Sequence, residues 1–189
     1  MDSRFVQAVK SSIIEMEVCG RVLKPMSMRH RLVLTEIGSP VIFTDKRFDP
    51  ADLVIAARIL STHHLKEMLC VKADDAETLK FAELFLDYGY YEQEMQKMAD
   101  YINFTDNMPI IWDKKREGNG RGINLPLSCV TNLIRNGMSY EQAWTMNECE
   151  AMWMYIANLV ADGGDITVIT EEDVKAMEFL KKLEASKAA

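Results

Sequence analysis

The chain has 189 residues, with 29 acidic and 22 basic side chains and a formal net charge of −7. Hydrophobic residues make up 48% and charged residues 27%, which is close to globular averages and excludes wholesale disorder. Nine Gly and five Pro are too few for a collagen-like or loop-rich chain. We therefore expect a single helical domain over residues 1–189.

Charge is distributed unevenly along the chain. Residues 61–110 and 136–189 each carry ten acidic and four basic side chains, whereas residues 111–135 carry five basic and two acidic ones. An acidic chain of this kind lacks the basic domain or stripe that is typical of nucleic-acid binders. The alternating blocks instead suit charge complementarity with a partner or between copies.

The cysteines predict neither a zinc site nor a secreted disulfide scaffold. All four are far apart in the sequence and form no C-x-x-C pair, so we expect small buried thiols in a reducing cytoplasm. The N-terminus has no apolar signal-peptide core. No apolar run approaches the roughly 20 residues needed to span a bilayer.

Helical periodicity and capping residues predict the elements of the N-terminal half. Apolar residues recur at helical spacing over 5–16, and we expect that helix to end at Gly20, which is free to adopt positive φ. Ser27 is a cap for a second helix that reaches about residue 37. Asp49 followed by Pro50 is a strong start for a third helix.

The longest helix is predicted over residues 74–104, with a kink or close helix crossing near Gly89. Its buried stripe is expected to consist of Phe81, Phe85, Tyr88, Met95, Ala99 and Ile102.

Residues 105–122 show no periodicity and predict a long functional or mobile loop, which is also where a domain seam would fall. The loop combines a tryptophan with a cluster of basic side chains in an otherwise acidic protein. We expect it to face a partner, because interface cores are enriched in Trp and Arg. The predicted partner-binding residues are Trp112, Lys114, Lys115, Arg116 and Arg121.

The C-terminal third contains clear helix signals. A helix over 127–136 is followed by a capping box that begins at Ser139, and a further helix begins at Asn147 and ends at the Gly163–Gly164 pair. Thr170 starts the last helix. Its apolar residues are expected to pack inward, namely Val174, Met177, Leu180 and Leu183.

No motif in the sequence specifies a chemistry. Neither nucleotide-binding fingerprint is present, and we assign no catalytic, metal or cofactor residue. His63 and His64 cannot both face one ion, because adjacent helical residues point in different directions, and we expect them to end a helix as imidazolium groups. Two alternatives stay open: a helical regulator or nucleic-acid-associated protein with a helix-turn-helix-like unit at 127–162, and an enzyme whose site is assembled from dispersed residues.

A resemblance appears in the segment Leu-Ile-Arg-Asn-Gly-Met-Ser-Tyr-Glu-Gln-Ala-Trp-Thr-Met-Asn-Glu-Cys-Glu-Ala-Met-Trp, residues 133–153. It is similar to small helical proteins of tailed-bacteriophage structural operons, of the tail assembly chaperone and tail-morphogenesis type. Residues 28–40 and 50–62 have a similar character, so that the resemblance covers about half of the chain. Its motifs are packing patterns, and it carries over no functional residue.

The resemblance implies a non-enzymatic bacteriophage morphogenesis or virion protein that acts through protein–protein contacts. Its partners would be other phage structural proteins and also copies of itself, without membrane or cofactor. Its location would be the host bacterial cytoplasm, with incorporation into the virion as a further possibility. The expected fold is all-α, an irregular bundle of about six to eight helices with one long central helix and a long loop.

Overall fold

The computed structural model describes residues 3–13, 15–43, 48–70, 72–112 and 124–188. It is mostly helical, as expected, but this part of the chain has ten helices where six to eight were predicted, and it also contains two small two-stranded antiparallel sheets. The elements in order are α1 (Ser3–Ser11), β1 (Met16–Val18), β2 (Arg21–Leu23), α2 (Met28–Glu36), α3 (Pro50–Leu60), α4 (Leu65–Met68), α5 (Asp75–Leu86), α6 (Tyr88–Thr105), β3 (Ile111–Trp112), α7 (Leu125–Arg135), α8 (Tyr140–Thr145), α9 (Glu148–Ala161), β4 (Thr167–Val168) and α10 (Glu171–Ala188). Within the described residues, every helix is too short or too polar to cross a membrane.

The predicted helix starts are confirmed where a capping residue marked them. Ser27, Asp49 and Ser139 each accept a hydrogen bond from the backbone N–H three residues later, and each belongs to a reciprocal capping box. The side chain of Asn147 accepts from the N–H groups of the first turn of α9. These local bonds satisfy donors that a helix cannot satisfy itself, so the sequence alone was enough to locate these starts.

The first predicted helix is shorter than expected. α1 ends at Ser11, and Gly20 lies in a β-hairpin between β1 and β2 instead of ending a helix. Cys19 and Gly20 both have positive φ, 51° and 73°, as a two-residue type I′ hairpin loop requires. The backbone N–H of Cys19 donates to the buried carboxylate of Glu94 at 2.6 Å, which holds this turn against α6.

The predicted long central helix is wrong, because two helices replace it. α5 and α6 meet at Asp87, which ends α5 in an extended conformation and accepts a hydrogen bond from the Tyr90 N–H as the cap of α6. The break therefore lies two residues before the expected kink at Gly89. Part of the predicted buried stripe is also wrong, since Phe81, Phe85 and Tyr88 are 40%, 72% and 65% exposed.

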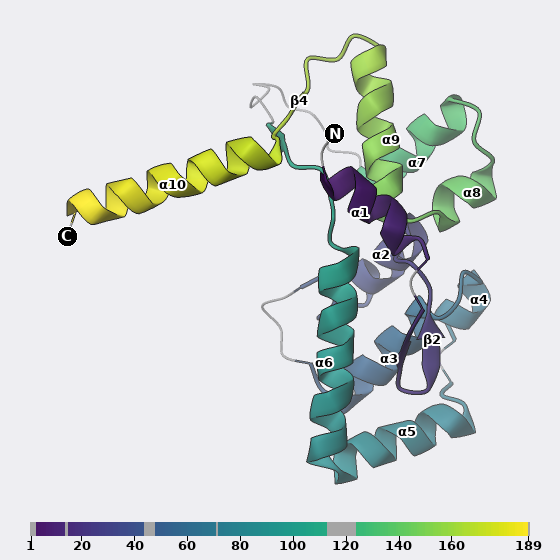
Figure 1. Cartoon of the computed structure of the whole chain (residues 1–189). Helices are drawn as coiled ribbons and strands as arrows, with labels where there is room; N and C mark the ends of the chain where they lie inside the picture. The colour runs from purple at the N-terminus through teal and green to yellow at the C-terminus, as the bar shows by residue number, and fades with distance from the viewer. Residues whose placement is uncertain (1–2, 14, 44–47, 71, 113–123, 189) are drawn as a thin grey trace.

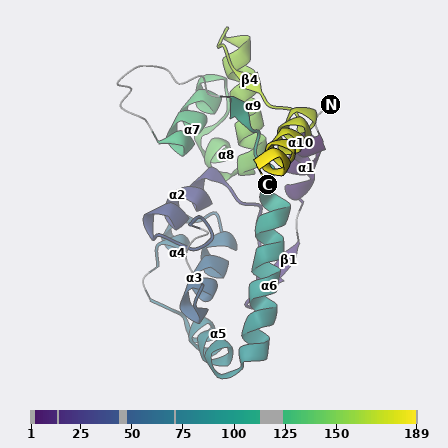
Figure 2. The same cartoon turned by 90° about the vertical axis from the view of Figure 1, so that its left-hand side faces the viewer.

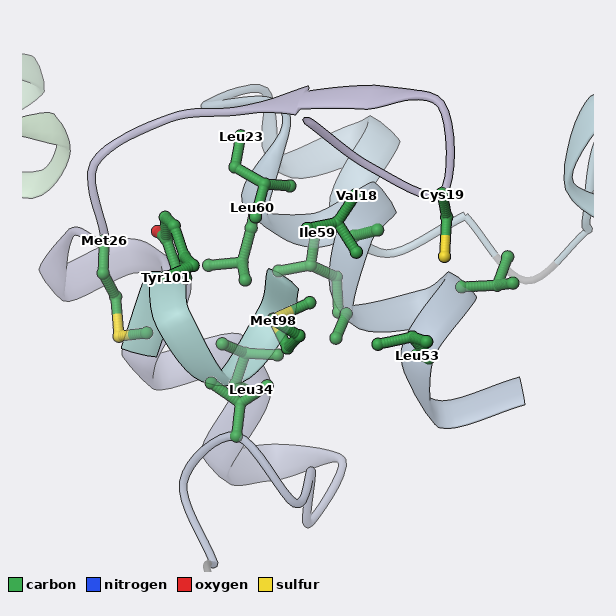
Figure 3. Packing of buried hydrophobic residues seen from close by; sticks show 14 of the residues in the cluster. Val18, Cys19, Leu23, Met26, Leu34, Leu53, Ile59, Leu60, Met98 and Tyr101 are labelled. Carbon is green, nitrogen blue, oxygen red and sulfur yellow. The ribbon is translucent and has the colours of Figure 1, made fainter. Parts of the chain in front are cut away.

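The apolar core consists of two clusters. The larger one lies between the hairpin and helices α2, α3, α5 and α6, and Figure 3 shows Leu23, Leu34, Leu60, Met98 and Tyr101 converging on it. The smaller cluster joins α7, α8 and α9 to Met28 at the start of α2. Because α2 contributes to both clusters, it helps to join the two parts of the fold.

Polar contacts reinforce the junction between the two clusters. Glu148 is 3% exposed, and its backbone N–H donates to the Met26 carbonyl at 2.8 Å. Its carboxylate accepts two hydrogen bonds from Arg31, from Nε at 2.5 Å and from Nη2 at 2.8 Å. Ser27 and Asn147 form a β-bridge beside it. A buried ion pair therefore lies at the point where α2 meets α9.

The last helix, α10, projects away from the body of the protein in Figure 1, and Figure 2 shows it foreshortened, pointing towards the viewer. Strand β4 precedes it and pairs with β3, which brings residues 111–112 beside residues 167–168. The sequence left residues 166–169 unassigned and placed residues 111–112 in a loop. The pairing of these two distant segments is a tertiary feature that neither segment signals alone.

Candidate functional site

The sequence-predicted partner site is only partly described by the structure. The backbone of Trp112 lies in β3, opposite Thr167 of β4, so this end of the predicted loop is a short strand. The side chain of Trp112 lies outside the described residues, as do the four predicted basic residues Lys114, Lys115, Arg116 and Arg121. Their role in binding a partner stays a prediction.

Residues 167–170, which we call the root of α10, lie beside residues 110–112 of the predicted loop. The Ile169 N–H donates to the Ile110 carbonyl at 2.8 Å, next to the β3–β4 pair. The Arg4 guanidinium of α1 donates to the carbonyl of Ile169. The first residues of the predicted loop and the beginning of α10 therefore occupy one place on the molecule, although nearly 60 residues separate them in sequence.

A local capping pair fixes the first turn of α10. The Thr170 N–H donates to the Asp173 carboxylate at 2.9 Å, and the Asp173 N–H donates to Thr170 Oγ1 at 3.2 Å. The Thr170 hydroxyl also donates to the same carboxylate at 2.7 Å, and these bonds lower the pKa of Asp173. The predicted start at Thr170 is thus confirmed.

Beyond that turn, α10 presents apolar side chains to solvent. Met177, Phe179 and Leu180 are 41%, 63% and 57% exposed. The predicted inward packing is wrong for Met177 and Leu180, because the helix leaves the body after β4 (Figure 1). The side chain of Leu183 lies outside those that the structure describes. We name the surface formed by Met177, Phe179 and Leu180 the arm face.

Sequence reasoning missed the arm face, although one signal was available. A helix that lies on a core has one apolar stripe and one polar face. In α10 the apolar residues do not stay on one stripe, since Phe179 lies beside the stripe that includes Met177 and Leu180. A broad apolar surface on a charged helix is unusual for a helix that only covers a core.

A separate open pocket of about 660 Å³ lies between α2, α4 and α8. Leu32, Val33, Leu65 and Trp144 form its apolar part. At its rim, Arg29 donates to both oxygens of Glu141, at 2.7 and 2.9 Å, and to the His63 carbonyl. These hydrogen bonds already engage the guanidinium of Arg29, so its charge is not free for a ligand.

Each strongly buried carboxylate among the described residues is paired with a cation. Glu77 pairs with Arg21 and Arg58, Glu94 pairs with Lys97, and Glu148 pairs with Arg31. Burial raises the pKa of Glu148 above its usual value, although the bonds from Arg31 act in the opposite direction. The ion pairs of Glu77 and Glu148 join different elements, whereas the Glu94–Lys97 pair lies within α6 and Glu94 reaches the β-hairpin through the Cys19 N–H.

The described thiols and imidazoles are also used in packing. Cys19, Cys129 and Cys149 are buried, and burial raises the pKa of each to about 12, so these thiols are protonated and poorly nucleophilic. Cys70 is exposed, which differs from the prediction of buried thiols.

The expectation that His63 is an imidazolium at a helix end is wrong. His63 follows α3, but burial lowers its pKa, and its ring stacks on His30 at 4.9 Å between centroids. His64, in contrast, is exposed at the start of α4. In the parts of the chain that the structure describes, no three His, Cys, Asp or Glu side chains are grouped as metal ligands.

Comparisons with protein families, with curated proteins and with solved structures found no match for this chain. The arm face and the root of α10 are therefore the candidate functional site on physical grounds. They combine exposed apolar area, a fixed root and a position beside the predicted binding loop.

Proposed function

We propose that this protein is a non-enzymatic bacteriophage morphogenesis or virion protein, of the tail assembly type, that acts through contacts with other structural proteins. The observation that carries the proposal is α10, an 18-residue helix that leaves the body with Met177, Phe179 and Leu180 exposed. In proteins most helical stability comes from packing an apolar face against another surface and not from helix propensity alone. A helix of this kind suits a protein whose binding partner completes the packing.

The chemistry of the body supports a role without catalysis. The buried acids are paired with cations, and the buried thiols are protonated. The resemblance of residues 133–153 to tail-morphogenesis proteins supports the phage setting, with the host cytoplasm or the virion as location. Nucleic acid is not a proposed partner, because Arg135 is the only basic residue between positions 124 and 161.

The proposal is tested by removing the gene product from the phage that encodes it. A nonsense mutation should give incomplete particles in negative-stain electron micrographs of lysates, and the full chain supplied from a plasmid should restore them. A chain that ends after Thr170 should fail to restore them while keeping the melting temperature of the body. Leu86→Ser, a change at an 82% exposed apolar residue of α5, is the matched control and should restore particles.

Normal particles in the absence of the chain would contradict the proposal. Restoration by the chain that ends after Thr170 would instead show that α10 is not the surface that carries the function. The melting temperature of each variant separates these results from a failure to fold.

The predicted loop gives a second test of the same function. We expect Trp112→Ala to weaken binding to a structural partner by roughly 2 kcal/mol or more, as truncation of an interface anchor does. Its effect on the free energy of unfolding should stay below about 1 kcal/mol, as for most surface substitutions. Isothermal titration calorimetry and urea unfolding measure the two quantities. A variant that unfolds while intrinsic binding is unchanged would place Trp112 in the core.

A further inference from the structure

The arm face leaves apolar area uncovered on a helix that projects from the body. Met177, Phe179 and Leu180 are each between 41% and 63% exposed, and they lie near the middle of α10. At 1.5 Å per residue, 18 residues make a helix of roughly 27 Å, long enough to lie against another helix over several turns. What covers this face must supply apolar side chains in the middle of the contact.

The charges of α10 are divided between its two halves. Residues 171–179 carry four acidic side chains and one lysine, whereas residues 180–188 carry three lysines and one acidic side chain. Two copies of α10 side by side in the same direction would place acidic half on acidic half and basic half on basic half. In the antiparallel arrangement each acidic half lies beside a basic half, and Phe179 and Leu180 of the two copies meet at the centre.

We infer that α10 associates with α10 of a second copy of this chain as an antiparallel helix pair centred on Phe179 and Leu180. The pair is isologous, because a two-fold axis through its centre brings the same surface of each copy together. Antiparallel alignment also places the positive end of each helix dipole beside the negative end of the other. The inference rests on the proposed function in taking α10 as the contact surface, and it names the partner of that surface.

The arrangement at the root of α10 is compatible with such a pair. The β3–β4 pair and the hydrogen bonds of Ile169 with Ile110 and Arg4 hold the start of α10 on the body, while the remaining turns project from it (Figure 1). A helix held at one end and free along its length can be approached by a second arm without displacing any element of the two cores. The bodies of the two copies then lie at opposite ends of the helix pair.

The first measurement is sedimentation equilibrium of the full chain. The average mass should rise from 21.6 kDa towards twice that value as the concentration increases from about 1 to about 100 µM, where mass action populates a weak dimer. The double variant Phe179→Ser, Leu180→Ser should stay monomeric over this range. The matched control Phe85→Ser, Leu86→Ser, at exposed residues of α5, should dimerise like the parent chain.

Charge reversal tests the direction of the pair. One variant carries Glu171→Lys, Glu172→Lys and Glu178→Lys, which leaves the capping residue Asp173 in place, and a second carries Lys181→Glu, Lys182→Glu and Lys187→Glu. Each alone gives α10 mostly one sign of charge, so its dimer dissociation constant should rise at least about tenfold. An equimolar mixture should form a heterodimer, and a chain that carries all six changes should regain the homodimer because the complementarity is restored.

A parent chain that is monomeric at the highest concentration would overturn the inference. The inference would also be overturned if the Phe179→Ser, Leu180→Ser variant still dimerised, or if charge reversal left the dimer dissociation constant unchanged. These outcomes are distinguishable from failure of the proposed function. If the chain is monomeric but truncation after Thr170 still blocks particle formation, the inferred dimer is wrong and the proposed function stands with a different partner. If the chain dimerises as inferred but the phage assembles without it, the dimer stands and the proposed function is wrong.

Discussion

Arg31→Ala should destabilise the protein by about 3–5 kcal/mol at neutral pH, because it leaves a buried carboxylate without its cation. Glu148 is 3% exposed, and Arg31 supplies two hydrogen bonds to its carboxylate. Urea unfolding followed by circular dichroism measures the loss.

The same variant should show a characteristic pH dependence. Burial already raises the pKa of Glu148, and without Arg31 that pKa rises further. A carboxyl group whose pKa is raised in the folded state destabilises the fold when it is forced to ionise. The difference in unfolding free energy between the parent chain and Arg31→Ala should therefore be larger at pH 7 than at pH 4. Glu148→Gln in the Arg31→Ala background should recover part of the loss at pH 7.

Glu141→Gln is the matched control for this ion pair. It breaks the Arg29–Glu141 pair, in which the Glu141 side chain is 66% exposed. An exposed pair contributes only about 0–1 kcal/mol, so the free energy of unfolding should change little. An effect of Arg31→Ala as small as that of Glu141→Gln would mean that Glu148 reaches solvent.

Stability should fall as the pH falls from about 6.5 towards 4, because His30 must stay neutral in the folded protein. Burial lowers the pKa of His30 from its ordinary value of 6.5 to about 4. A histidine whose pKa is lowered by folding binds its proton more readily in the unfolded chain. The contribution of His30 is therefore complete above pH 6.5 and is lost as the pH falls to 4, with a total of about 3 kcal/mol.

Burial is the main cause of the lowered pKa of His30, and it outweighs the backbone hydrogen bonds to Thr62 and Pro25, which act in the opposite direction. The Ser27 N–H points at Nδ1 at 3.2 Å, so Nδ1 accepts, while Nε2 lies 2.7 Å from the Thr62 carbonyl and donates to it. A second proton on Nδ1 would face the Ser27 N–H and lose the capping box of α2. The neighbouring ring of His63 and the guanidinium of Arg29 oppose a positive charge there as well.

His30→Gln isolates this contribution. Glutamine is a natural third residue of a capping box, so its side-chain oxygen can accept from the Ser27 N–H. We expect the variant to fold and to lose most of the stability change between pH 6.5 and pH 4. His64→Gln, at an exposed position, should show the same change of unfolding free energy with pH as the parent chain. An unchanged slope in His30→Gln would assign the acid sensitivity to other groups.

Much of the secondary structure of this protein is determined by short-range signals that the sequence displays directly. The starts of α2, α3, α8 and α9 follow from Ser27, Asp49, Ser139 and Asn147, because a capping side chain bonds to backbone groups within three residues. The same holds for Thr170 and α10. Such bonds need no tertiary partner, and sequence reasoning located them correctly.

At other positions the local sequence is compatible with more than one backbone conformation, and tertiary packing determines which of them is adopted. Gly20 can end a helix or form a hairpin loop, and the bond from the Cys19 N–H to Glu94 on distant α6 favours the hairpin. Asp87 can lie within a helix or cap a new one. The turn there lets α5 and α6 pack on different sides of one cluster of apolar residues.

For the candidate site, the sequence by itself determined that α10 is a helix with an acidic half, a basic half and apolar residues between them. It could not determine which way those residues face, because the same spacing suits a helix on a core and a helix that projects from one. The antiparallel pairing of β3 with β4 decided this, since it directs the chain away from the body at Thr167–Val168. The arm face exists because a contact between residues more than 50 positions apart sets the direction of the last helix.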